Sequence, residues 1–290
     1  MQQLSSPKEM RDWSRAERAR GRRIGFVPTM GSLHEGHLQL VDRAKQRADR
    51  VVMSIFVNPL QFSPAEDLAQ YPRDLERDRT LAAERGVDCL FVPDTAAMYP
   101  TEPLVRISPG PMADTLEGAA RPGHFAGVLT VVAKLFHIVE PDIAVFGRKD
   151  FQQAMLVRRM VADLDFGFEI DVAPTVRELD GLALSSRNTY LKGDDRRAAL
   201  ALSRALRAVE QAWRSGEADA KALQRRGMQT LMAPGVTPAY LELVDEQIRP
   251  VARADARTVV VIAARVGSTR LIDNVVLGEG VASDVAVRAS

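Results

Sequence analysis

Apolar residues follow two alternating patterns along the first 180 residues of the chain. Short apolar runs with the length of buried strands lie at 24–27, 51–57, 87–92, 143–146 and 168–172. Between them, apolar residues recur at helical spacing at 36–49, 74–85, 125–139 and 151–164. Alternating strands and helices build a parallel sheet with helices on both faces. We therefore predict an α/β fold with a Rossmann-like, doubly wound parallel sheet.

The pattern changes after about residue 180. Charged helical stretches at 194–215 and 220–232 precede strand-like segments at 240–244, 258–264 and 269–273. Helices followed by grouped strands are typical of an α+β domain. The sequence thus predicts a Rossmann-like domain over 1–180 and a smaller α+β domain over 181–290, which we expect to act as a lid.

Composition narrows the class of protein. The chain has 290 residues, 46% of them hydrophobic, which is enough for a sizeable core and two domains. Its 39 Lys and Arg nearly balance 38 Asp and Glu, which counts against a nucleic-acid partner. Residues 1–23 lack the apolar core of a signal peptide, and no apolar run approaches the ~20 residues of a membrane span. We expect a cytoplasmic protein without a membrane partner, with Cys89 buried in an apolar run.

The most informative segment is Pro-Thr-Met-Gly-Ser-Leu-His-Glu-Gly-His at 28–37. It joins a predicted strand to a predicted helix, and such a turn offers backbone N–H groups and a positive helix end to an anion. Gly31 and Gly36 permit close approach of a phosphate. His34 and His37 lie one helical turn apart and can donate hydrogen bonds toward the same point. The segment favours the phosphate chain of ATP as its ligand.

Two other interpretations of the histidines are weaker. His34-Glu35 resembles the start of a zinc-protease helix motif, but that motif needs its second histidine four residues after the first, where this chain has Leu38. Two ordinary surface histidines at a helix start remain an alternative for the pair alone. That alternative leaves both glycines and the preceding strand unexplained.

Further polar groups follow later predicted strands or lie near the domain boundary. Ligands of parallel sheets collect beyond the carboxyl ends of strands, where residues 58–62 and 147–150 fall. Lys149 is suited to a phosphate, and Asp150 to magnesium or a ribose. The Ser-Ser-Arg group at 185–187 is suited to the outer phosphates. Each group taken alone also fits an ordinary solvated loop or helix start.

Gln61 and Gln153 carry side-chain amides, which both donate and accept hydrogen bonds. A hydroxy acid needs both kinds of partner. Taken alone, each residue is explained equally well as an exposed glutamine without a special function.

Five ordered motifs resemble one family. The motifs are Pro-Thr-Met-Gly-x-Leu-His-x-Gly-His at 28–37, Phe-Val-Asn-Pro-Leu-Gln-Phe at 56–62, Arg-Pro-Gly-His-Phe at 121–125, Lys-Asp-Phe-Gln-Gln at 149–153 and Asp-Gly-Leu-Ala-Leu-Ser-Ser-Arg-Asn at 180–188. Together they resemble the pantothenate synthetase (pantoate–beta-alanine ligase) family over nearly the whole chain. The first motif is shared by a wider nucleotidyltransferase superfamily that includes class I aminoacyl-tRNA synthetases.

The resemblance implies a ligation in two steps. Pantoate and ATP would give pantoyl adenylate and pyrophosphate, and the amine of beta-alanine would then displace AMP to give pantothenate. It also implies magnesium as a cofactor, a homodimer, and binding of ATP and pantoate by the first domain. A substrate carboxylate that attacks the α-phosphate needs no enzyme nucleophile, so catalysis would rest on alignment and on neutralising phosphate charge.

The resemblance also implies roles for single residues. His34, His37 and Lys149 would be catalytic, with His37 the proton donor, and Gln61 and Gln153 would bind pantoate. The ATP contacts would be Met30, Gly31, Ser32, Leu33, His34, Glu35, Gly36, His37, Gly147, Arg148, Lys149, Asp150, Val176, Leu184, Ser185, Ser186 and Arg187. No metal ligand is assigned beyond Asp150 as a candidate, and His124 is expected to border the pocket.

One residue departs from the family pattern. The family usually has glutamate where this chain has Arg148. The added positive charge beside Lys149 either tightens ATP binding or faces solvent. Two other classes of function stay open from the sequence: another adenylyl- or cytidylyltransferase of the superfamily, and a nucleotide sensor without turnover.

Overall fold

The computed structural model describes residues 1–62, 68 and 71–287. Their contacts divide the chain into two compact units. Unit 1 comprises Met1–Gly147 and Gln152–Ala173, and unit 2 comprises Arg148–Phe151 and Pro174–Ser290. The division into domains at 1–180 and 181–290 stays a prediction.

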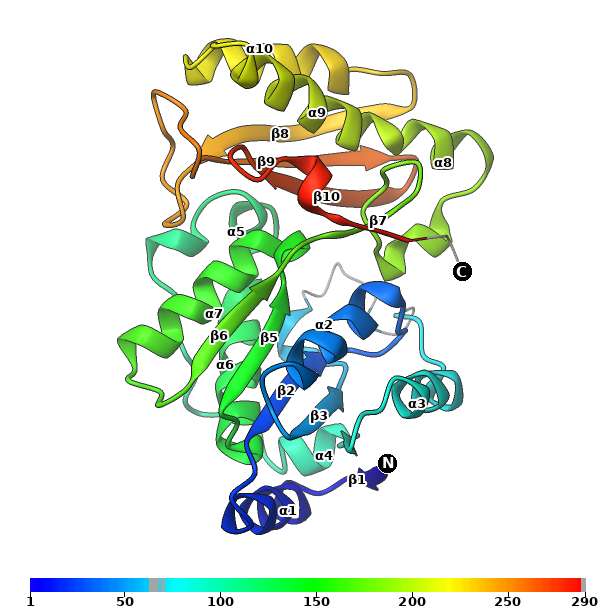
Figure 1. Cartoon of the computed structure of the whole chain (residues 1–290), viewed down its shortest axis with the longest axis vertical. Coiled ribbons are helices and arrows are strands. Elements are labelled where there is room, and N and C mark those ends of the chain that lie inside the picture. The colour runs from blue at the N-terminus through cyan, green and yellow to red at the C-terminus, as the bar shows by residue number, and fades with distance from the viewer. Residues whose placement is uncertain (63–67, 69–70, 288–290) are drawn as a thin grey trace. The chain divides into compact units, whose positions relative to one another are not determined.

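Unit 1 is built on a six-stranded sheet in the order β1-β4-β3-β2-β5-β6, in which each neighbouring pair is parallel (Figure 1). Its strands are β1 (Gln2–Leu4), β2 (Ile24–Thr29), β3 (Arg50–Ile55), β4 (Cys89–Phe91), β5 (Ile143–Gly147) and β6 (Glu169–Ala173). The predicted Rossmann-like fold is confirmed. The strand order changes direction between β2 and β5, and ligands of such sheets bind beyond the carboxyl ends at that point.

Helices cover this sheet. They are α1 (Pro7–Ala19), α2 (Glu35–Lys45), α3 (Leu75–Glu84), α4 (Thr95–Met98), α5 (Glu117–Ala120), α6 (His124–Val139) and α7 (Phe151–Asp163), with 3₁₀ turns η1 (Pro59–Gln61) and η2 (Pro111–Ala113). In Figure 1, α2 lies in front of the strands and α6 behind them. A Cβ at Gly25 of β2 would come within 3.2 Å of the Cβ of Ala44 and 3.1 Å of that of Ala48. Glycine at this position therefore lets α2 pack closely on the sheet.

Unit 2 carries a three-stranded antiparallel sheet in the order β10-β9-β8 and a separate parallel pair of β7 and β11. Its elements are η3 (Arg148–Asp150), β7 (Val176–Glu178), η4 (Ser186–Tyr190), α8 (Gly193–Ala198), α9 (Leu200–Arg214), α10 (Ala220–Leu231), β8 (Val236–Val244), β9 (Val259–Val266), β10 (Thr269–Val276), η5 (Val281–Ser283) and β11 (Val285–Val287). Helices α9 and α10 pack on the antiparallel sheet around the buried side chains of Leu206, Leu223 and Ile262. The predicted α+β character of the C-terminal part is confirmed.

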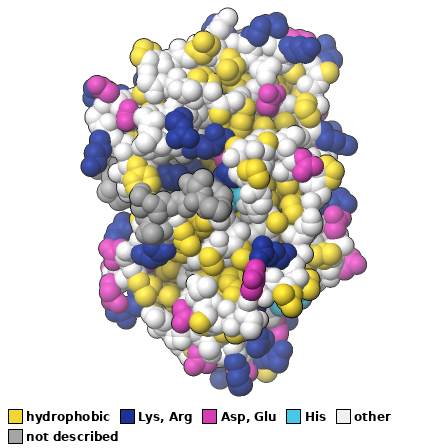
Figure 2. Space-filling model, turned by 180° about the vertical axis from the view of Figure 1, so that it is seen from behind, with side chains coloured by type: hydrophobic (Ala, Val, Ile, Leu, Met, Phe, Trp, Pro, Cys, Tyr) yellow, Lys and Arg dark blue, Asp and Glu magenta, His cyan; other side chains and the backbone are white. Residues whose placement is uncertain are grey.

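On the face shown in Figure 2, basic and acidic side chains both lie at several separate places. This agrees with a formal net charge of +1. Among the described residues, none of the helices has both the length and the apolar character that crossing a bilayer requires.

Cys89 is predicted to be unreactive in the folded protein. The residue lies in β4 with 0% of its surface exposed, and burial raises the pKa of its thiol to about 12. Only the thiolate attacks alkylating reagents. We expect no labelling by iodoacetamide at pH 8 in the native protein and complete labelling in guanidinium chloride, both measured by intact-mass spectrometry. Rapid labelling without denaturant would contradict the buried position.

Candidate active site

The turn after β2 holds the two predicted catalytic histidines of unit 1. His34 is the N-cap of α2, and its Nδ1 accepts a hydrogen bond of 3.1 Å from the N–H of Gly36. The Nδ1 of His37 faces the N–H of His34 at 3.4 Å, and the two rings stack with centroids 4.1 Å apart. Because each Nδ1 accepts from the backbone, each neutral ring carries its proton on Nε2. The pair thus presents two Nε2–H donors at the positive end of α2.

The backbone of this turn lies in the left-handed region at two successive residues. Gly31 has φ 84° and Ser32 has φ 52°. A Cβ at Gly31 would lie 2.9 Å from the Oδ2 atom of Asp78 and 3.0 Å from a methyl carbon of Ile55. The neighbouring side chains therefore require glycine at position 31. The sequence explained this glycine only by the approach of a phosphate.

A second polar group of unit 1 surrounds Gln61. The Oε1 of Gln61 accepts from Nδ2 of Asn58 at 3.1 Å, and its Nε2 lies 3.0 Å from the sulfur of Met30. Tyr99 donates in turn to Oδ1 of Asn58 at 2.9 Å. These contacts fix the amide of Gln61 with its NH₂ group on the side of Met30. Gln61, which is expected to bind pantoate, and Met30, which is expected to contact ATP, therefore lie in contact.

Close packing of α6 supports this group. A Cβ at Gly127 would lie 2.1 Å from the carbonyl oxygen of Leu60, so only glycine allows the helix to approach the turn at η1. The buried His124 accepts from Arg121 through Nε2 at 2.9 Å and donates from Nδ1 to the carbonyl of Gln61 at 2.9 Å. His124 therefore holds the backbone of Gln61 in place.

The adjacent glutamines of α7 differ in their surroundings. Gln152 is buried and donates to the carbonyls of Met112 at 2.8 Å and Thr115 at 2.9 Å, while it accepts from the N–H of Glu117 at 3.0 Å. Gln153 is half-buried and makes no hydrogen bond to the described part of the chain. Gln152 thus fixes a loop, while the predicted role of Gln153 in binding a ligand stays a prediction.

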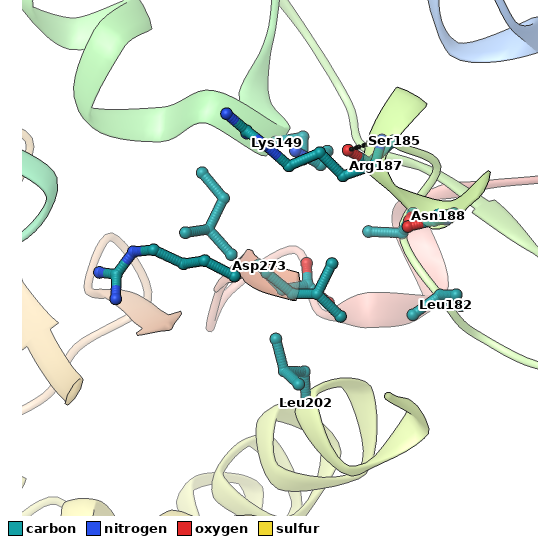
Figure 3. A pocket seen from close by; sticks show the side chains of 11 residues that line it. Lys149, Leu182, Ser185, Arg187, Asn188, Leu202 and Asp273 are labelled. Atoms are coloured by element: carbon teal, nitrogen blue, oxygen red, sulfur yellow. Dashed lines mark hydrogen bonds between the residues drawn. The ribbon is translucent and has the colours of Figure 1, made fainter. Parts of the chain in front are cut away.

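In unit 2, Lys149, Ser185 and Arg187 line one pocket (Figure 3). These three were predicted to bind phosphates, and in Figure 3 they lie together while Leu202 of α9 faces them from the other side. Ser185 accepts from the N–H of Arg187 at 3.2 Å, which orders the start of η4. Asn274 of β10 donates to the carbonyl of Lys149 at 3.0 Å.

The electrostatics of this pocket favour an anion. Its lining includes the cations Lys149, Arg187 and Arg270 and one carboxylate, Asp273. The charge of Asp273 is already balanced, because Arg177 donates to both of its oxygens at 2.6 and 2.8 Å. Most of the other lining residues are apolar, so any attraction of this pocket for phosphate groups comes from the three cations.

Arg148 does not face solvent, so that part of the sequence-based expectation is wrong. The residue is 7% exposed, and its guanidinium pairs with Glu279 and, at 3.1 Å, with Asp284. Asn274 also donates to the carbonyl of Arg148 at 2.8 Å. The sequence did not predict these ion pairs, because both acids lie more than 130 residues after Arg148 in the chain.

These contacts predict a small effect of Arg148 on ATP. The change Arg148→Met should alter the Kd for ATP by less than tenfold, below about 1.4 kcal/mol, because the guanidinium is engaged by acids of its own unit. Isothermal titration measures the affinity, and thermal unfolding serves as the control for folding. A larger change in a folded variant would show that Arg148 contacts the nucleotide directly.

The remaining predicted residues divide between the units. Gly147 ends β5 in unit 1. Val176 and Leu184 lie together in unit 2, where the N–H of Leu184 donates to the carbonyl of Val176 at 2.8 Å. Asp150 has a side chain that is 48% exposed and lies 3.7 Å from the Lys149 ammonium.

Comparison with known proteins identifies the family. The family model for pantoate-beta-alanine ligase matches residues 2–276. The chain belongs to this family. It is 50% identical over 273 residues to a pantothenate synthetase of Pelotomaculum thermopropionicum, covering 93% of this chain and 97% of the relative. The resemblance inferred from the motifs is confirmed.

Solved structures of relatives agree with the fold of this ligase. A pantothenate synthetase from Thermus thermophilus is 46% identical and matches with a TM-score of 0.90, covering 96% of this chain and 99% of that one. A pantoate-beta-alanine ligase from Francisella tularensis, solved as a complex with beta-gamma ATP and beta-alanine, is 35% identical with a TM-score of 0.80 and covers 97% and 99% of the two chains.

Proposed function

We propose that this ligase makes pantothenate through an acyl adenylate. The carboxylate of pantoate attacks the α-phosphorus of ATP and releases pyrophosphate. The amine of beta-alanine then attacks the acyl carbon, and AMP leaves. The observation that carries the proposal is the stacked pair of His34 and His37 at the start of α2, directly after β2 and beside the change of strand order. No nucleophile of the enzyme is needed for either step.

The two histidines act on the charge that develops during adenylation. Their Nε2–H groups donate hydrogen bonds to oxygens of the α- and β-phosphates, and His37 is the donor toward the leaving pyrophosphate. The first backbone N–H groups of α2 add positive potential at the same end. Donors fixed before the reaction stabilise the transition state without reorganisation, and this is their main contribution to the rate.

The residues of the unit 2 pocket hold the outer phosphates. Lys149 supplies a point charge, Arg187 a planar fork of donors, and Ser185 and Ser186 their hydroxyls. The backbone at Val176 meets the adenine. The support is the positive lining described above, whose only acid, among the described residues, is already paired with an arginine.

Pantoate is held by the two glutamine amides. The NH₂ of Gln61 has two N–H donors, of which one points to the sulfur of Met30, and the second donates to a carboxylate or hydroxyl of pantoate. Gln153 offers both a donor and an acceptor. Their roles require that the substrate carry oxygen donors and acceptors close together, as a hydroxy acid does.

Magnesium fits this site as an ion bound mainly by ATP. Within the described residues, no group of three or more His, Cys, Asp or Glu side chains is placed to hold a metal. Mg²⁺ keeps several waters and needs only one or two carboxylates besides substrate phosphates. The half-exposed Asp150 is the protein residue that would contact it. Bound there, the ion would neutralise charge on the phosphate oxygens.

The test is an assay of products by mass spectrometry. With ATP, pantoate, beta-alanine and magnesium, we expect pantothenate and AMP in equal amounts. Without beta-alanine, we expect ATP–pyrophosphate exchange that depends on pantoate. Release of ADP, or exchange without pantoate, would contradict the proposal. Exchange that depends on a phosphate or an alcohol in place of pantoate would favour another nucleotidyltransferase. Binding of ATP without formation of AMP would favour a nucleotide sensor.

Family membership also supports a homodimer as the working form, and a cytoplasmic location stays a prediction. Sedimentation equilibrium at micromolar concentration would test the oligomeric state. A mass of about twice the 31.9 kDa chain supports the dimer, and a mass equal to that of the chain contradicts it.

A further inference from the structure

Asp78 is a buried charge that the reaction scheme above does not use. It lies in the first turn of α3 and is only 1% exposed. Its two carboxylate oxygens accept from the N–H groups of Ser32 at 2.8 Å and Leu33 at 2.7 Å. A carboxylate is rarely buried unless its oxygens are satisfied, and here two backbone donors of the same turn satisfy them.

Arg77, the residue before Asp78, binds a carbonyl group of the same turn. Arg77 donates from its guanidinium to the carbonyl of Leu33 at 2.8 Å. Adjacent side chains of α3 thus engage both the N–H and the C=O of Leu33. His34 follows directly in the chain, so the peptide group that positions His34 is held from outside the turn.

The backbone of the turn needs such support. Ser32 has φ 52°, a left-handed conformation that is unfavourable for a residue with a Cβ. The two hydrogen bonds to Asp78 are made only while Ser32 and Leu33 point their N–H groups to the same side. Gly31 leaves room for the carboxylate, which would lie 2.9 Å from a Cβ at that position.

We propose that Asp78 is a positioning residue, which sets the turn at 31–33 and through it the orientation of the His34 ring. This inference rests on the proposed role of His34 toward the phosphates of ATP. Asp78 acts through the turn, because both of its carboxylate oxygens accept from backbone N–H groups of the protein. Its loss lets the turn relax, and the imidazole donor moves away from the phosphate oxygen that it has to meet. Misplacement by about 1 Å is enough to reduce the rate by roughly 10²-fold.

The test compares Asp78→Asn with Asp74→Asn in ATP–pyrophosphate exchange. Asp74 is the N-cap of the same helix and accepts from the N–H of Arg77 at 3.1 Å, and its side chain makes no hydrogen bond to the turn at 31–33 within the described structure. It therefore matches Asp78 in element and charge, but it is exposed and bonds its own helix instead of the turn. We expect Asp78→Asn to lower kcat by roughly 10- to 100-fold, and Asp74→Asn to change it by less than about twofold. The affinity for pantoate, measured by titration, should stay within about twofold in both variants.

A double mutant separates positioning from general destabilisation. If Asp78 acts through His34, Asp78→Asn should cost less than about twofold once His34 is already alanine, since coupled residues are not additive. Full additivity, or equal losses in the Asp78 and Asp74 variants, would overturn the proposal. If Asp78→Asn does not fold by circular dichroism, Arg77→Met replaces it in the same cycle, with an expected loss of roughly 3- to 10-fold.

The outcomes also separate this proposal from the proposed function. Failure of the wild-type protein to exchange pyrophosphate with pantoate would refute the function. An active wild type, a weakened His34→Ala variant and an unaffected Asp78→Asn variant would refute only the positioning role.

Discussion

Alanine in place of His37 or Lys149 is expected to lower pantoate-dependent ATP–pyrophosphate exchange by roughly 10²–10³-fold without unfolding the protein. In the proposed mechanism each side chain donates to phosphate oxygens on which charge grows in the transition state, and removal of one such donor has a cost of this order. Neither change removes a core side chain. Asn274 holds the carbonyl of Lys149, a contact that the alanine variant retains.

The controls for this prediction are a histidine and a lysine outside the site. His137 is an exposed residue in the last turn of α6, and Lys221 is an exposed residue of α10. His137→Ala and Lys221→Ala should keep wild-type exchange, and all four variants should show the wild-type circular dichroism spectrum. Near-wild-type exchange in both His37→Ala and Lys149→Ala would overturn the assignment of the site.

Replacement of Arg177 by methionine is expected to reduce the free energy of unfolding of unit 2 by about 3–5 kcal/mol. The side chain is 3% exposed, as are those of Asp273 and Asp284, and it donates to Asp284 at 2.6 Å as well as to both oxygens of Asp273. Burial opposes its charge, but these two carboxylates hold the pKa of Arg177 above its ordinary value. Methionine would leave buried carboxylates without their main partner, and that is the costly outcome.

Guanidinium unfolding followed by tryptophan fluorescence measures this effect. The chain has two tryptophans, of which Trp213 lies in unit 2, so a Trp13→Phe background makes the emission report on that unit. The matched control is Arg249→Met, which removes an ion pair between Asp245 and a side chain that is 71% exposed. Exposed pairs contribute at most about 1 kcal/mol. Equal losses in the two variants would show that the buried network adds no more than a surface pair.

The long elements of the fold were predictable from the sequence, because periodicity reports burial directly. The apolar runs at 24–27 and 143–146 became β2 and β5, and helical spacing at 125–139 became α6. Strands β1, β7 and β11 are three residues each and too short to show a period, whereas the equally short β4 lies within the longer apolar run at 87–92. In addition, β7 pairs with β11 more than 100 residues away, and no local pattern indicates such a pairing.

The residues of the candidate site were predictable where motifs identify them, and the residues that support them were not. His34, Lys149 and Gln61 belong to recognisable strings. Asp78 lies in a polar helix, where an acid in the first turn is ordinarily explained by the helix dipole. Its burial comes from backbone donors 45 and 46 residues earlier in the chain. Long-range polar contacts of this kind leave no trace in local sequence.

The membership of Arg148–Phe151 in unit 2 has a consequence for protein engineering. The chain passes from one unit to the other after Gly147, after Phe151 and after Ala173. A gene fragment that starts at Pro174 therefore encodes Asn274 but not the lysine whose carbonyl it holds. Chimeras of two homologues joined at that position would combine Lys149 of one parent with Asn274 of the other. Exchange of the C-terminal part alone therefore transfers only some of the residues of the site.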